Sequence, residues 1–154
     1  MRRKNVVLIV VICVVVVLAV VAALVFLLPG TGAGASAEGT VRKYFDAWGK
    51  KDIQAMDACL IQSEQGKNAY GGLSMEAGVT LNSVSVVEDP EAKERFDQAR
   101  VDTSDGYALL STSYIIRYND EGQQLYKQDQ ATHTGYLFWL VKEGGAWRIA
   151  RQGY

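Results

Sequence analysis

Side chains that could perform acid–base chemistry are few in this 154-residue sequence and stand far apart. His133 is the only histidine, Glu64 lies in a polar stretch, and Tyr44 shares a helical stripe with Val41 and Trp48. A single histidine cannot build a His-rich metal site, and no cysteine or carboxylate stands beside it at ligand spacing. We therefore expect no metal and no cofactor, and we expect Tyr44 to be a core aromatic residue.

The acidic residues around Pro90 offer no better catalytic pair. Glu88, Asp89 and Glu91 cluster there, but charges in a turn are normally solvated, and a general acid needs a buried neighbour that raises its pKa. The sequence also has no glycine-rich phosphate loop, no nucleophile elbow and no paired-cysteine metal motif. These observations favour a non-enzymatic module over an enzyme.

A long uncharged run precedes the part of the chain that carries these residues. Val6 to Leu28 is 23 residues, or about 34 Å as a helix, against a hydrocarbon core of about 30 Å. Arg42 is the first basic residue after the run, and the basic residues before it are Arg2, Arg3 and Lys4. The positive-inside rule then predicts a single-pass membrane protein with a cytoplasmic N-terminus.

The chain therefore divides into three expected parts. Residues 1–30 are the basic flank and transmembrane helix, residues 31–37 are a flexible linker of small residues, and residues 38–154 are one extracytoplasmic domain. The small residues Ala35 and Ala37 around Ser36 leave an alternative open, in which a signal peptidase cleaves near Ala37 and the domain is secreted.

Charge and cysteine content exclude some functions for residues 38–154. All 17 acidic residues but only 13 of the 16 basic ones lie in this part, which gives a formal charge of 13 − 17 = −4. The longest basic cluster is Lys50 with Lys51, so we expect no nucleic-acid partner. Cys59 stands alone, which makes an intrachain disulfide impossible in this part and a buried thiol the expected state.

Apolar spacing predicts two helices followed by a sheet. One helical stripe comprises Val41, Tyr44, Phe45 and Trp48, and Gly49 ends that helix. Asp52 caps a second helix, whose apolar residues are Ile53, Met56, Cys59 and Leu60. The two helices form a hairpin.

Strand signals occupy the rest of the domain. We expect a loop over residues 64–78, a strand over residues 79–87 with a bulge between Leu81 and Val84, and a chain break at Pro90. Strands over residues 107–118, 132–142 and 146–152 follow, with turns at residues 119–122 and 143–145. Helices first and strands afterwards predict an α+β domain in which the helix hairpin packs on a curved antiparallel sheet.

Six consecutive apolar residues, 136–141, place apolar side chains on both faces of that sheet. The helix hairpin covers only one face, so a second cover is needed. A homodimer through the outer face is our prediction, and the loop over residues 64–78 folding back is the alternative.

This order of elements resembles the nuclear transport factor 2-like superfamily across residues 38–154. The resemblance rests on Val41 to Ile53 (VRKYFDAWGKKDI), the second helix, the antiparallel meander and the terminal Ala146 to Ile149 (AWRI). It implies a bent sheet around a conical cavity, and it places Tyr44 where ketosteroid isomerases carry an oxyanion-donating tyrosine. The residues that we expect at such a pocket are Tyr44, Trp48, Tyr114, His133 and Trp139.

Two functions follow from these observations. The first is a membrane-anchored extracytoplasmic module, without enzymatic activity, that binds an envelope protein or a small apolar ligand. The resemblance extends to small bacterial membrane proteins and lipoproteins and to anchored domains of secretion and conjugation assemblies. The alternative is a cavity enzyme, isomerase- or dehydratase-like, that uses Tyr44 with Glu64 or His133.

Overall fold

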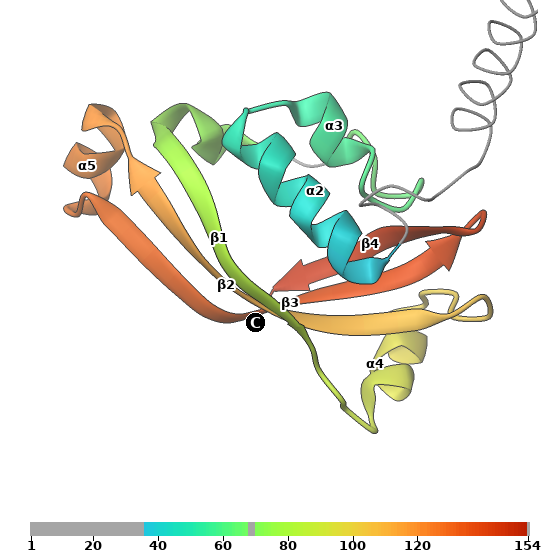
Figure 1. Cartoon of the computed structure of the whole chain (residues 1–154). Helices are drawn as coiled ribbons and strands as arrows, with labels where there is room; N and C mark the ends of the chain where they lie inside the picture. The colour runs from blue at the N-terminus through green and yellow to red at the C-terminus, as the bar shows by residue number, and fades with distance from the viewer. Residues whose placement is uncertain (1–35, 68–69, 154) are drawn as a thin grey trace, which may run out of the picture. The chain divides into compact units, whose positions relative to one another are not determined.

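The computed structural model describes residues 36–67 and 70–153, which form an α+β fold with four antiparallel strands and four α-helices. Figure 1 shows α2 and α3 on one side of a strongly bent sheet and α4 on the other. In chain order the elements are α2 (Ala37–Gly49), α3 (Ile53–Asp57), the 3-10 helix η1 (Gly71–Met75), β1 (Glu76–Val86), α4 (Ala92–Gln98), β2 (Tyr107–Tyr118), α5 (Asp120–Tyr126), β3 (Gln130–Glu143) and β4 (Ala146–Gly153).

The first helix forms where the apolar stripe predicts it. Ser36 caps α2, since its Oγ accepts a hydrogen bond from the Gly39 N–H at 3.0 Å, and the helix ends at Gly49 as expected. The four residues of the stripe face the sheet; Val41, Tyr44 and Phe45 are buried, and Trp48 is half-buried. The amphipathic pattern alone therefore positions this helix.

The second helix is shorter than predicted. Asp52 caps α3 through a hydrogen bond from the Ala55 N–H at 3.0 Å, but the helix ends at Asp57 instead of reaching Leu60. The next residues leave the helix to pair with the edge of the sheet: the Ile149 N–H donates to the Cys59 carbonyl oxygen at 2.8 Å. Tertiary pairing of backbone groups overrides the helical spacing of their side chains.

The sheet is the predicted antiparallel meander, with strand order β1-β2-β3-β4. A register shift in β1 between Leu81 and Ser83 confirms the bulge expected there. A second shift lies in the β2–β3 pair beside Thr112, and Gly135 on β3 has the positive φ of 71° that glycine tolerates. These irregularities bend the sheet around α2.

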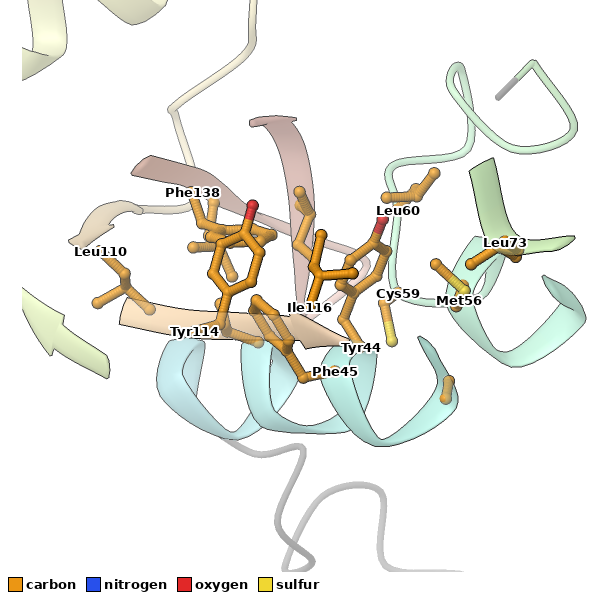
Figure 2. Close-up of a cluster of buried hydrophobic side chains, with 14 residues drawn as sticks. Tyr44, Phe45, Met56, Cys59, Leu60, Leu73, Leu110, Tyr114, Ile116 and Phe138 are labelled. Carbon is orange, nitrogen blue, oxygen red and sulfur yellow. The ribbon is translucent and has the colours of Figure 1, made fainter. Parts of the chain in front are cut away.

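The inner face of the sheet and α2 enclose the main core. Figure 2 shows the aromatic rings of Tyr44, Phe45, Tyr114 and Phe138 packed together above the helix. Phe138 contacts both Tyr44 and Phe45, with ring centroids 5.8 and 5.7 Å apart. The buried members of this cluster have at most 8% of their surface exposed, so the space between helix and sheet is largely closed to solvent.

The part of the outer face around Trp139 is covered by α4, an element that neither sequence alternative invoked. Phe96 on α4 is fully buried and lies 4.9 Å from Trp139 on β3, in a second cluster with Leu109 and Val141. The alternative cover, residues 64–78 folding back over this face, is not what the described residues show: Tyr70 and Leu73 pack in the inner cluster, and residues 76–78 begin β1. Apolar side chains on both faces of β3 thus have covers within the chain.

The four-residue turn predicted at residues 119–122 is instead the start of α5. The Asn119 side-chain oxygen accepts a hydrogen bond from the Gly122 N–H at 3.0 Å and so acts as the N-cap. Asparagine opens both turns and helices, which makes the two outcomes hard to separate from the sequence. The Asn119 N–H also donates to the Met75 carbonyl oxygen at 3.0 Å, which ties α5 to η1.

No helix within residues 36–67 and 70–153 is long and apolar enough to cross a membrane. The membrane character expected of the chain therefore has no support from this part of it. The span predicted at residues 6–28 and most of the predicted linker lie outside the described residues.

Candidate functional site

Four of the five predicted pocket residues form one aromatic row on the inner face of the sheet. The ring centroids of Tyr44 and Trp48 are 6.2 Å apart, those of Trp48 and Tyr114 are 5.6 Å apart, and Tyr114 stacks on His133 at 4.7 Å. The fifth residue, Trp139, lies on the opposite face beneath α4. The row runs from the buried core to the half-exposed His133.

Tyr44 and Tyr114 of this row are buried in the core, and no residue of the row lines the three hollows described below. The Tyr44 hydroxyl oxygen accepts a hydrogen bond from Gln152 Nε2 at 3.2 Å, and its ring packs against Phe45 and Phe138. Burial raises the pKa of Tyr44 to about 12, so the phenol stays protonated at neutral pH. These contacts give Tyr44 the structural role predicted for it.

The residues of the alternative enzymatic reading have separate partners. Tyr44 is bonded to Gln152, His133 stacks on Tyr114, and Glu64 forms a partly exposed ion pair with Lys67 at 3.5 Å. Nothing in these contacts favours a catalytic set of Tyr44 with Glu64 or His133.

A carboxylate does contact the aromatic row, at the half-buried Trp48. Trp48 Nε1 donates a hydrogen bond to Glu76 Oε2 at 2.6 Å. Desolvation by burial raises the pKa of Glu76, while the hydrogen bond from Trp48 lowers it and partly opposes the shift. The pair joins α2 to the start of β1 and serves the fold.

Three hollows in the surface meet elsewhere, around Arg151 on β4. The hairpin hollow, of about 570 Å³, lies between the β3–β4 hairpin and the segment after α4 and includes Glu143 and Asp102. The outer hollow, of about 520 Å³, lies between α4 and the end of β4, and the edge hollow, of about 170 Å³, lies beside Leu60. Arg151 lines all three, and we call the combined surface the Arg151 groove.

The sheet register explains why Arg151 faces this groove. Arg151 pairs with Trp139, and both side chains are on the outer face, whereas the next pair, Gln152 with Phe138, points inward. A bulge in β4 opposite Trp139 and Leu140 leaves Ala150 as the extra residue.

The end of α4 forms the opposite wall of the groove. The Val101 N–H donates to the Phe96 carbonyl oxygen and the Arg100 N–H to the Asp97 carbonyl oxygen, both at 3.0 Å. These two bonds are a Schellman motif, in which the residue after the cap adopts a left-handed conformation. Arg100 does so with a φ of 56°, where glycine is the usual residue, and it lines the hairpin hollow.

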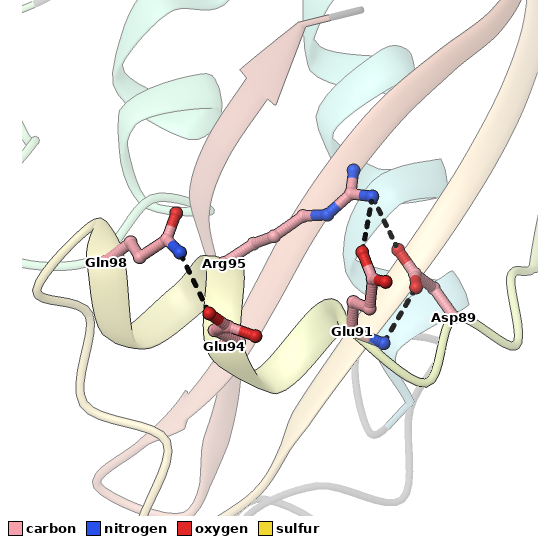
Figure 3. A network of polar contacts seen from close by, with 5 residues as sticks. All are labelled: Asp89, Glu91, Glu94, Arg95 and Gln98. Carbon is pink, nitrogen blue, oxygen red and sulfur yellow. Dashed lines mark hydrogen bonds and ion pairs between the residues drawn. The ribbon is translucent and has the colours of Figure 1, made fainter.

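The outer hollow is the positively charged part of the groove. It is lined by two arginines, two glutamines, one tryptophan and two small residues, and no aspartate or glutamate is among them: Arg95, Arg151, Gln98, Gln152, Trp139, Ala99 and Gly153. Figure 3 shows that the Arg95 guanidinium reaches Asp89 and Glu91, which hold it at 3.7 and 3.5 Å. In the described part of the chain no carboxylate lies within ion-pair distance of Arg151.

Sequence reasoning missed Arg151. The signal that could have found it is the alternation of side chains along the last strand: if Gln152 faces inward, the neighbouring Arg151 places a cation on the outer face. The position of α4, which turns that face into a groove, was not visible in the pattern. Within the residues that the structure describes, no group of three or more His, Cys, Asp or Glu side chains could hold a metal ion.

Comparisons with known proteins identify no family for this chain. No family model and no curated protein matches it. A solved structure that does match is that of a SEC-C motif containing protein from Rhodopseudomonas palustris, with 13% identity and a TM-score of 0.48 over 79% of this chain and 80% of the other. Similarity at this level assigns no function.

The expected nuclear transport factor 2-like identity is corrected by these findings. The described residues form a four-stranded antiparallel meander with helices, which does not clearly belong to that superfamily. What remains of the fold prediction is the coarser statement, an α+β domain with an antiparallel sheet.

Proposed function

We propose that this protein is a non-enzymatic binding module that takes a protein or peptide partner in the Arg151 groove. The observation that carries the proposal is the meeting of three hollows at one exposed arginine, beside an edge strand of the sheet. A groove with a few polar groups and an aromatic wall is the usual form of a recognition site. A small apolar ligand has less support, because the aromatic cluster between α2 and the sheet is largely closed to solvent.

The location that we propose for this module is outside the cytoplasm, and it rests on the sequence alone. Val6 to Leu28 carries no charge, and basic residues precede it. Protease added to cells with permeable walls should digest the domain, and protection until lysis would contradict this location. Mass spectrometry of the extracted protein should find residues 1–28 retained; their absence would indicate cleavage near Ala37.

The homodimer remains a prediction, with a weaker premise than the sequence suggested. Its reason was an uncovered apolar face, and α4 covers the part of that face around Trp139. Beyond α4 the outer face carries hydroxyl side chains, including Ser113 and Thr134, which pair across β2 and β3. Sedimentation of the purified protein at micromolar concentration would test it.

Site-specific photo-crosslinking tests the binding proposal in intact cells. A benzoylphenylalanine placed at Gln98, on the wall of the outer hollow, should give a discrete crosslinked product. The same probe at Ser83, exposed on β1, is the matched control. An excess of the purified protein without the probe should compete for the partner and so lower the yield of the product from Gln98. Equal labelling from both positions, or none from Gln98, would contradict the Arg151 groove as the binding site.

A further inference from the structure

We propose that the partner of the Arg151 groove is an extended acidic peptide that adds as a strand to the open end of β4. This inference rests on the proposed binding function and names the chemistry of the partner. Strand addition uses backbone hydrogen bonds for affinity and side-chain pockets for specificity. The observations that support it, all within the described residues, are an edge without a backbone partner, one hollow along that edge and one on its outer face, and a guanidinium without a carboxylate partner.

The edge of β4 is half occupied by the chain itself. Ile149 donates its N–H to the Cys59 carbonyl oxygen at 2.8 Å and accepts from the Ile61 N–H at 3.0 Å, so residues 59–61 act as a short parallel neighbour. The chain then turns away, with the Glu64 N–H bonded to the Ile61 carbonyl oxygen at 2.9 Å. Within the described residues no backbone hydrogen bond occupies the free side of residues 150–153. The strand position continues, but nothing in this part of the chain fills it.

The vacant position coincides with the hollows. The edge hollow lies between Leu60 and Gln152, where an added strand would run, and the outer hollow opens on one face of that line. Successive side chains of a strand point to opposite faces. The peptide side chains on the outer face would therefore lie beside Arg151, at the outer hollow.

The chemistry of the outer hollow favours a carboxylate on those side chains. Arg151 has no carboxylate partner among the described residues, and Arg95 uses only Nη2 for Asp89 and Glu91, which leaves other N–H donors of its guanidinium. Guanidinium groups bind carboxylates through paired, charge-assisted hydrogen bonds. Because residues 38–154 carry a formal charge of 13 − 17 = −4, this selectivity arises from the local arginines and not from the overall field.

Fluorescence anisotropy with defined peptides tests the inference. The probes are labelled nonapeptides that alternate valine with glutamate, glutamine or lysine, and the protein is the full chain in mild detergent, since residues 6–28 are apolar. The glutamate peptide should bind at least about tenfold more tightly than the glutamine peptide and more weakly at high salt. Binding of the lysine peptide at equal strength would overturn the acidic preference.

Charge reversal separates recognition from folding. Arg151→Glu should lose the glutamate peptide and gain the lysine peptide, a swap that a misfolded variant could not show. Arg117→Glu, at an exposed position on the outer face of β2, is the matched control and should change neither affinity. Loss of both peptides with Arg151→Glu, or the same swap with Arg117→Glu, would refute the role of Arg151.

Amide hydrogen exchange tests strand addition itself. The bound glutamate peptide should slow exchange at residues 150–153, whereas free glutamate at saturating concentration should not. Protection by free glutamate, or peptide binding without protection, would mean a simple carboxylate site and overturn the strand model. If no peptide binds while the Gln98 crosslink persists, this inference fails and the proposed function stands; if the crosslink is absent as well, both fail.

Discussion

Replacing Trp48 by phenylalanine should weaken the domain mainly through one hydrogen bond. The indole stacks on Phe45 at 5.4 Å and lies 5.6 Å from Tyr114, contacts that a phenyl ring largely preserves. What phenylalanine cannot replace is the Nε1–H that donates to Glu76 Oε2 at 2.6 Å. The substitution therefore leaves a half-buried carboxylate without its indole donor.

The expected loss follows from the charge of the acceptor. Hydrogen bonds to charged groups contribute about 1.5–3 kcal/mol, and neutral ones about 0.5–1.5 kcal/mol. Trp48→Phe should therefore lower the free energy of unfolding by about 1.5–3 kcal/mol at pH 7. Trp48→Ala, which also removes the ring contacts, should cost about 3–5 kcal/mol. In a Glu76→Gln background the Trp48→Phe cost should fall to the neutral range.

The same pair predicts a dependence on pH. Burial raises the pKa of Glu76, so the folded protein binds this proton more tightly than the unfolded chain does. The free energy of unfolding should then fall as pH rises from the ordinary glutamate pKa through the raised pKa of the folded state. Glu76→Gln, which has no titrating proton, should remove this part of the slope.

Urea unfolding between about pH 4 and pH 7, followed by tryptophan fluorescence and circular dichroism, measures both effects. Glu88→Gln, which also removes one carboxylate but from an exposed position away from Trp48, is the matched control. Equal slopes for the parent protein and Glu76→Gln would refute the assignment to Glu76. A cost below about 0.5 kcal/mol for Trp48→Phe would refute the hydrogen bond.

Three further substitutions or reactions test other parts of the fold. Gly122→Ala should lower the free energy of unfolding by about 1–3 kcal/mol, because a Cβ there would collide with the Met75 carbonyl oxygen. Gly71→Ala, with open space around it, should change little, and equal effects of the two substitutions in urea unfolding would contradict this packing. Cys59 should stay unreactive toward Ellman's reagent until the protein unfolds, since it is 1% exposed and burial raises its thiol pKa; reaction at the rate of a free thiol would contradict that burial. Trp139→Asp should destabilise the domain by about 2–4 kcal/mol, because the side chain packs under α4; a variant with an unchanged melting temperature would contradict that cover.

Elements governed by local patterns could be predicted from the sequence. The stripe that contains Val41 and Tyr44 needs only helical spacing, and β2 follows from a run of strand-forming residues between turn signals. Where one residue type supports two local structures, prediction failed. Asn119 caps α5 where a turn was expected, because its side chain can satisfy backbone N–H groups in either conformation.

The amino-acid pattern is enough to require a cover on both faces of the sheet, since residues 136–141 place apolar side chains on each face and water-exposed apolar patches of that size are unfavourable. The identity of the covers, α2 on the inner face and α4 around Trp139 on the outer, emerges from the folded arrangement. The folded arrangement also decides that Arg151 lies in a groove, because that requires α4, the sheet register and residues 59–61 to meet at one strand edge. The physical reason is that periodicity records which side of an element avoids water, whereas the choice of neighbour depends on packing between segments distant in the chain.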